Sequence, residues 1–259
     1  MQPIFTRYLY EKRETMHALL VALIKRQVDE SLFWTYELYF SGFELELWDW
    51  VACIYEEFYE RRNPRYKHHL FAKYDEWSDT QDPLLIGSVI LTLAHRLSDT
   101  HLYLERMGVD ACAEIRPLPP SKEKYVFQFN TLANYTTVSP AKLTDVSLYS
   151  IPKTLTRFFM DRTNLRELTD DAIRDAYLSA DWLYYCRETP LWLTRIREHD
   201  GTIDHTKKRV VFPNDDLHES FYEKYGLEPD EQSREIHEIH GIRGIYKLYS
   251  IDEFRLVFS

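Results

Sequence analysis

The segment from Leu32 to Phe40 reads LFWTYELYF, and Glu37 is its only charged residue. A helix that is apolar on most of its surface is buried on several sides. Gly42 follows the segment and favours a left-handed cap that ends the helix. Because a run this long cannot face one core with every residue, we expect part of it to meet another helix layer or another chain.

Helical periodicity continues on both sides of this segment. Residues 11–27 place apolar side chains three and four positions apart, which predicts an amphipathic helix. Its apolar stripe comprises Met16, Leu19, Leu20, Leu23 and Ile24. Residues 43–62 show the same spacing, and a shorter helix is expected from Pro64 to about Tyr74. Asp82-Pro83 caps the next helix, whose apolar stripe runs to Leu97 and which Gly108 closes. The first part of the chain therefore predicts about five consecutive antiparallel helices.

A proline-rich break separates this region from the rest of the chain. Residues 116–120 read RPLPP, which favours extended backbone. Residues 125–130 alternate apolar and polar side chains. This pattern predicts either a short strand or a loop anchored by aromatic rings. Residues 202–204 and 209–212 predict a small β-hairpin. Further helices are expected from residue 139 onward and at 169–187, 190–201, 215–225 and 229–240.

The predicted fold is mostly α. We expect a multi-helix bundle of consecutive antiparallel helices with a minor β-hairpin in the C-terminal half. The predicted organisation is a helical N-terminal subdomain at 1–115, a crossing segment at 116–138 and a helical C-terminal subdomain at 139–259.

Composition limits both the compartment and the function. The chain has 259 residues, with 42 acidic against 32 basic ones and a formal net charge of −10. This balance argues against a compact nucleic-acid-binding protein. No uncharged apolar stretch reaches the roughly 18 residues of a membrane span, and no signal-peptide pattern is seen. The three cysteines are widely spaced, which favours reduced thiols. We therefore expect a protein that is neither secreted nor embedded in a membrane.

Aromatic side chains supply the leading candidate for a contact surface. Rings give large burial in a core, but tryptophan and tyrosine also dominate the hot spots of protein interfaces. Two neighbouring predicted helices concentrate them. The candidate interface comprises Phe33, Trp34, Tyr36, Tyr39, Phe40, Trp48 and Trp50.

Basic and metal-ligating residues form weaker candidates. For nucleic acid, the basic clusters are Arg61, Arg62, Arg65 and Lys67, and Lys207, Lys208 and Arg209. Both clusters lie beside acidic runs, which favours solvated helix ends and loops. For a divalent metal, the spacings of Asp171 with Asp175 and of His237 with His240 place each pair on one helical face. Charges that stabilise helix termini explain these pairs better. The sequence has no glycine-rich phosphate loop and no nucleophile elbow, so we predict no cofactor and favour a non-enzymatic protein, with an active site spread across the fold left open.

Residues 31–43, SLFWTYELYFSGF, and residues 5–11, FTRYLYE, resemble a poorly characterised protein family of nucleocytoplasmic large DNA viruses. The resemblance covers residues 5–64 and carries no catalytic assignment. It implies a viral origin and a location in the host cytoplasm, the viral factory or the virion.

The leading hypothesis is a non-enzymatic helical interaction or assembly protein of such a virus. It would act as a minor component of the particle or as a scaffold in the factory, with protein partners or further copies of itself. One alternative is a replication or transcription accessory factor that contacts nucleic acid. The other is a divalent-metal-dependent enzyme.

Overall fold

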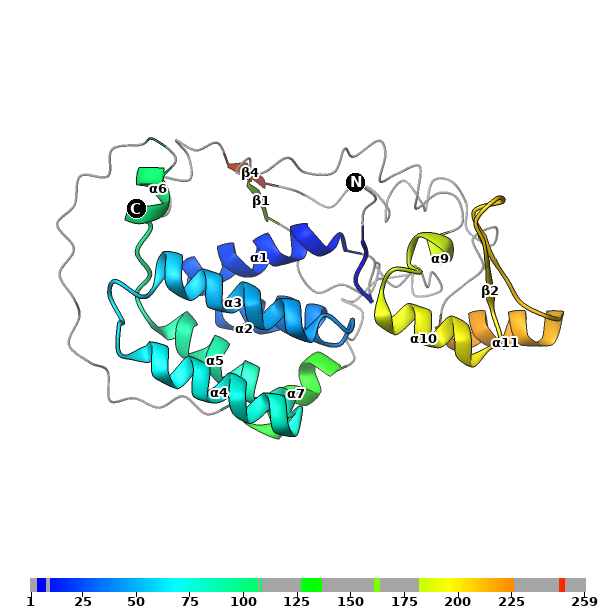
Figure 1. Ribbon diagram of the computed structural model, residues 1–259, viewed down its shortest axis with the longest axis horizontal. Helices are drawn as coiled ribbons and strands as arrows, with labels where there is room; N and C mark the ends of the chain where they lie inside the picture. The colour runs from blue at the N-terminus through cyan, green and yellow to red at the C-terminus, as the bar shows by residue number, and fades with distance from the viewer. Residues whose placement is uncertain are drawn as a thin grey trace, which may run out of the picture.

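The computed structural model describes residues 4–7, 10–106, 108, 127–136, 161–163, 182–225 and 247–249 (Figure 1). Their fold is mostly helical, with a small antiparallel hairpin in the C-terminal half, as predicted. The helices are α1 (Lys12–Ile24), α2 (Val28–Tyr39), α3 (Glu44–Phe58), α4 (Tyr66–Thr80), α5 (Pro83–His95), α6 (His101–Arg106), α7 (Phe129–Thr136), α9 (Trp182–Tyr185), α10 (Pro190–Glu198) and α11 (Asp215–Tyr225). The strands are β1 (Asp161–Thr163), β2 (Thr202–Asp204), β3 (Arg209–Val211) and β4 (Lys247–Tyr249).

Helix α1 is buried around most of its circumference. It buries Glu14, Thr15 and every residue from His17 to Ile24, so burial extends around the helix. Helices α2 and α5 and strand β1 all contact it. The prediction of a one-sided apolar stripe is therefore corrected, because neighbours cover this helix on several sides.

Short connections reverse the chain between the first five helices (Figure 1). Gly42 has φ +90° between α2 and α3, which confirms the predicted left-handed cap. Asp82 Oδ1 accepts a hydrogen bond of 2.9 Å from Leu84 N, and Pro83 opens α5, as predicted. Helix α5 ends at His95, before the predicted stop at Gly108, because Arg96 adopts extended backbone with φ −93° and ψ 154°. Helix α4 continues to Thr80, beyond its predicted end, because Trp77 still packs on α3.

Helix α7 and the residues before it close one side of the bundle. The rings of Phe127 and Tyr135 stack on the ring of Tyr36, with centroids 5.6 Å and 5.5 Å away. Within residues 125–130, the described part is a segment anchored by an aromatic ring that leads into a helix. This matches the loop interpretation of that stretch rather than the strand.

A second, smaller hydrophobic cluster lies among α9, α10, the β2–β3 hairpin and α11. Trp192, Phe212 and Phe221 form its centre, and Phe5 from the N-terminal segment packs into it with no exposed surface. Strands β2 and β3 pair antiparallel, with Thr202 opposite Val211. Hydrogen bonds between described residues join this unit to the N-terminal part: Thr189 Oγ1 donates to Phe5 O, and Leu191 N donates one of 3.3 Å to Ser41 O.

Strands β1 and β4 form a parallel pair that the sequence did not predict. Of the helix expected at 169–187, the structure describes α9 alone. The helices expected from residue 139 onward and at 229–240 lie outside the described residues.

Candidate functional site at the charged ends of the bundle

The aromatic residues expected to form a contact surface lie in the core of the chain itself. Five of the rings are buried: Phe33, Trp34, Tyr36, Tyr39 and Trp48. The side chains of Phe40 and Trp50 are half-buried against the same core. The structure thus corrects the interface expectation. Helices α1, α3, α5 and α7 cover the rings of α2, whereas Trp48 of α3 packs on Trp77 of α4 and Trp50 contacts Met16 of α1.

The polar groups of these rings are also used internally. The hydroxyl of Tyr36 donates to Pro83 O at 2.9 Å, and that of Tyr39 donates to Gln81 O at 3.0 Å. The indole of Trp50 donates to Met16 O at 2.7 Å. Burial raises the pKa of Tyr36 far above its usual range, so this hydroxyl stays protonated as a donor.

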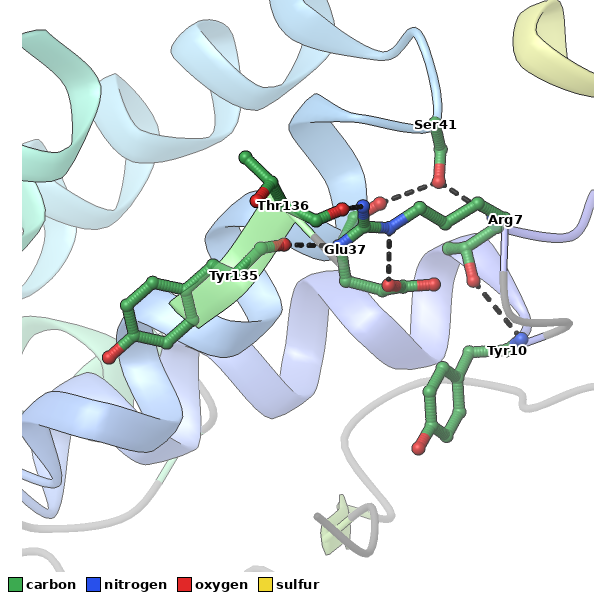
Figure 2. A network of polar contacts seen from close by, with 7 residues as sticks. Arg7, Tyr10, Glu37, Ser41, Tyr135 and Thr136 are labelled. Carbon is green, nitrogen blue, oxygen red and sulfur yellow. Dashed lines mark hydrogen bonds and ion pairs between the residues drawn. The ribbon is translucent and has the colours of Figure 1, made fainter. Parts of the chain in front are cut away.

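Figure 2 shows a buried polar network around Arg7. Its Nε contacts Glu37 Oε2 at 3.0 Å, and the two side chains are 7% and 0% exposed. The remaining guanidinium nitrogens donate to the carbonyl oxygens of Tyr135 and Thr136, at 2.7 Å and 2.6 Å. These carbonyls lie in the last turn of α7, where the helix leaves its acceptors unpaired. Arg7 therefore ties α7 to α2, and the network has the character of a structural joint.

The metal candidates remain predictions. Asp171, Asp175, His237 and His240 all lie outside the described residues. Within the described part of the chain, no group of three or more histidine, cysteine, aspartate or glutamate side chains is placed to hold a metal ion.

The second basic cluster lies on the turn between β2 and β3. Lys207, Lys208 and Arg209 are exposed there. The carboxylate of Asp204 accepts hydrogen bonds of 2.9 Å from Thr206 N and Lys207 N. The backbone hydrogen bond from Lys207 is the main cause of the lowered pKa of Asp204. The carboxylate of Asp204 thus orders the turn, which presents its cations to solvent.

The first basic cluster is partly neutralised within the fold. Lys67 Nζ lies 3.0 Å from Glu60 Oε1 and 3.4 Å from Glu56 Oε1, and the hydrogen bond to Glu60 is the main reason that its pKa is raised. Arg61 Nε lies 3.8 Å from Asp99 Oδ2. Arg62 and Arg65 form no ion pair with any residue that the structure describes.

Two arginines from other helices join Arg62 and Arg65, and we call these four residues the basic end. Arg96, after α5, donates to Asn63 Oδ1 at 3.1 Å and places its guanidinium 4.7 Å from the centre of the Tyr66 ring. Arg26, after α1, donates to His95 O at 3.4 Å. None of the four pairs with a described carboxylate, so this end of the bundle carries excess positive charge.

Buried donors at the basic end lack acceptors. Nε of Arg62 and Nε of Arg96 are inaccessible to solvent, yet each has no hydrogen-bond partner among the described residues. The hydroxyl of Tyr59, on the same α3–α4 connection, is also buried without a hydrogen-bond partner among the described residues. Buried donors without a protein partner are rare in folded proteins, and buried water is their usual acceptor.

Carboxylates dominate the opposite end of the α3–α4 pair. Glu44, Asp49, Asp75 and Asp79 have no cationic partner among the described residues, and we call them the acidic end. Trp48 packs on Tyr74 and Trp77, with ring centroids 5.6 Å and 5.7 Å apart, which brings the start of α3 beside the end of α4. Burial is the main cause of the raised pKa of Glu44.

The two charged ends are electrostatically independent in physiological salt. Helix α3 has 15 residues and therefore spans about 22 Å. This length exceeds the screening length of about 8 Å at physiological ionic strength. Each end therefore presents its own charge to a partner.

Sequence reasoning found Arg62 and Arg65 but missed Arg26 and Arg96. The predicted alternation of helix directions could have identified them, because antiparallel neighbours bring the C-terminal ends of α1, α3 and α5 to one side of the bundle. Each of those ends carries an arginine.

Comparison with known proteins gives no relative for this chain: no family model, no curated protein and no solved structure matches it. None of the described helices is both long and apolar enough to cross a bilayer.

Proposed function

We propose that the chain is a non-enzymatic interaction or assembly protein that contacts its protein partners through the charged ends of its helical bundle. The observation that carries this proposal is the separation of arginines at one end from carboxylates at the other, none of which forms an ion pair with a described residue. Complementary charge of this kind guides association and selects partners.

In this proposal the aromatic residues stabilise the core of the bundle, and the charged ends form the contact surface. Rings packed inside the bundle make it rigid, and a rigid scaffold presents surface charges at fixed positions. The resemblance of residues 5–64 to a viral family gives the setting, a large DNA virus in which the chain is a particle component or a factory scaffold. This setting remains a proposal.

Quantitative mass spectrometry of purified particles and of infected cells tests this function. A fixed ratio of this chain to the major shell protein is expected for a particle component, and abundance in the factory fraction is expected for a scaffold. Cross-links from Lys25 or Lys67, beside the basic end, should then reach another protein. Absence of the chain from both fractions would contradict the proposal.

Nucleic-acid binding is the second candidate, supported by the exposed Lys207, Lys208 and Arg209. Titration with duplex DNA at low salt tests it, because phosphate contacts give an affinity that falls steeply as salt rises. Binding that is lost in Lys207→Glu/Lys208→Glu and retained in Arg62→Glu/Arg65→Glu would favour this function. Absence of binding at low salt would remove it.

A further inference from the structure

We infer that the partner of the basic end is the acidic end of a second copy of this chain, so that copies associate head to tail. This inference rests on the proposed function and names the partner. It places Arg62, Arg65 and Arg96 of one copy against Glu44, Asp49 and Asp79 of the next.

Hydrogen-bonding capacity is complementary between the two ends. The basic end offers the guanidinium groups of Arg62 and Arg65, which form no ion pair with a described carboxylate. The acidic end offers exposed carboxylates of Asp49, Asp75 and Asp79 that have no donor within the described fold. Guanidinium and carboxylate groups form the strongest charge-assisted hydrogen bonds available to side chains. A copy-to-copy contact would therefore pair the charges of both ends.

An exposed apolar side chain accompanies each end. Leu45, between Glu44 and Glu46 at the acidic end, is 60% exposed. Leu97, next to Arg96 at the basic end, is 39% exposed, and its carbonyl oxygen accepts a hydrogen bond of 3.2 Å from Asn63 Nδ2. An apolar residue within a charged rim is the usual arrangement of a protein interface. Contact between Leu45 and Leu97 would remove both side chains from water.

Charge determines which ends of two copies can meet. Like charges would meet if two copies paired the same end, whereas opposite ends attract. The end-to-end contact that we infer is heterologous, and contacts of this kind produce rings or open chains. Each copy in the chain uses both of its ends.

Sedimentation velocity of the full chain, treated with nuclease, tests the inference. We expect concentration-dependent oligomers at about 50 mM NaCl that weaken at least about tenfold at about 500 mM NaCl, because screening acts on exposed charges. Reversal of the basic end in Arg62→Glu/Arg65→Glu should weaken association at least about tenfold, as should reversal of the acidic end in Asp49→Lys/Asp79→Lys. If Arg62→Glu disturbs folding, Arg26→Glu/Arg65→Glu replaces exposed residues only.

Mixing the two reversed variants is the decisive step. Each variant alone is expected to be monomeric, but the intact basic end of one fits the intact acidic end of the other, so the mixture should form heterodimers. The matched control is Lys207→Glu/Lys208→Glu, which changes the net charge as much as the basic-end reversal does and should leave association unchanged.

Three results would overturn the inference: a monomer at every salt concentration, association indifferent to both reversals, or association that requires nucleic acid. Each of these results would exclude the copy-to-copy contact without testing the proposed function. The proposed function is tested separately, by mass spectrometry of particles and infected cells, so failure of the inference and failure of the proposed function are distinguishable.

Discussion

Removing Arg7 should destabilise the fold far more than breaking a surface ion pair of the same length. Arg7→Met leaves the carboxylate of Glu37, which has no exposed surface, without its guanidinium partner. It also strips the carbonyl oxygens of Tyr135 and Thr136 of their donors. Breaking one side of a buried pair costs about 3–5 kcal/mol of unfolding free energy, and we expect Arg7→Met to fall in that range.

A double-mutant cycle isolates the interaction itself. Replacing both partners, in Arg7→Met/Glu37→Met, removes the stranded charge along with the pair, so its cost should be smaller than the sum of the single substitutions. We expect a coupling energy of about 2–3 kcal/mol. Urea denaturation followed by tryptophan fluorescence provides the measurement, because Trp34 and Trp48 are buried in the bundle.

The chain contains a matched control for this cycle. Lys12 Nζ lies 3.1 Å from Glu46 Oε1, which is close to the Arg7–Glu37 separation, but these side chains are 15% and 53% exposed. Exposed pairs contribute less than about 1 kcal/mol, so a Lys12→Met/Glu46→Met cycle should show little coupling. Equal coupling in the two cycles would refute the argument that burial sets the strength of the Arg7–Glu37 pair.

Three further predictions concern the core. Burial raises the pKa of Glu11 from 4.5 to about 7, so between these values the folded state binds more protons than the unfolded state, and stability falls as pH rises. The urea midpoint should decline across this pH window in the native chain and much less in Glu11→Gln. Equal slopes in the two proteins would contradict the prediction. Gly87→Ala should lower the free energy of unfolding by about 1–3 kcal/mol, measured with heat or urea, because an added Cβ overlaps Tyr36 Oη and the Phe127 ring. The control is Gly108→Ala, whose added Cβ meets no atom within 4 Å and which should cost less despite its φ of +73°. Trp50→Phe should lose about 1 kcal/mol by removing the donor to Met16 O, and an unchanged urea midpoint would show that water replaces it.

Periodicity and capping residues predicted the helices well, because both are properties of nearby residues. Asp82-Pro83 and Gly42 end or begin helices through their own backbone geometry, so their roles follow from the sequence. The burial of α1 on several sides was not predictable in this way, because it depends on which elements surround the helix. The sequence shows one stripe, and the tertiary arrangement buries the remaining faces.

The candidate site was predicted only in part for the same reason. Arg62 and Arg65 are close in sequence and form a visible basic cluster, but Arg26 and Arg96 reach them only through the antiparallel course of the bundle. The aromatic run was assigned to an interface because a sequence cannot show how many layers cover a helix. The buried network of Arg7 joins residues 128 and 129 positions apart, which no local pattern reports.

The position of Phe5 sets an order of events during synthesis. Its carbonyl oxygen accepts a hydrogen bond from Thr189, which follows 184 residues later in the chain. At a translation rate of about 5–20 residues per second, this partner emerges about 10–40 s after Phe5. Helices α1–α5 can fold in that interval, whereas Phe5 must wait with its ring uncovered. A chaperone that binds exposed aromatic residues would therefore find its target in this segment of the nascent chain, well before the fold is complete.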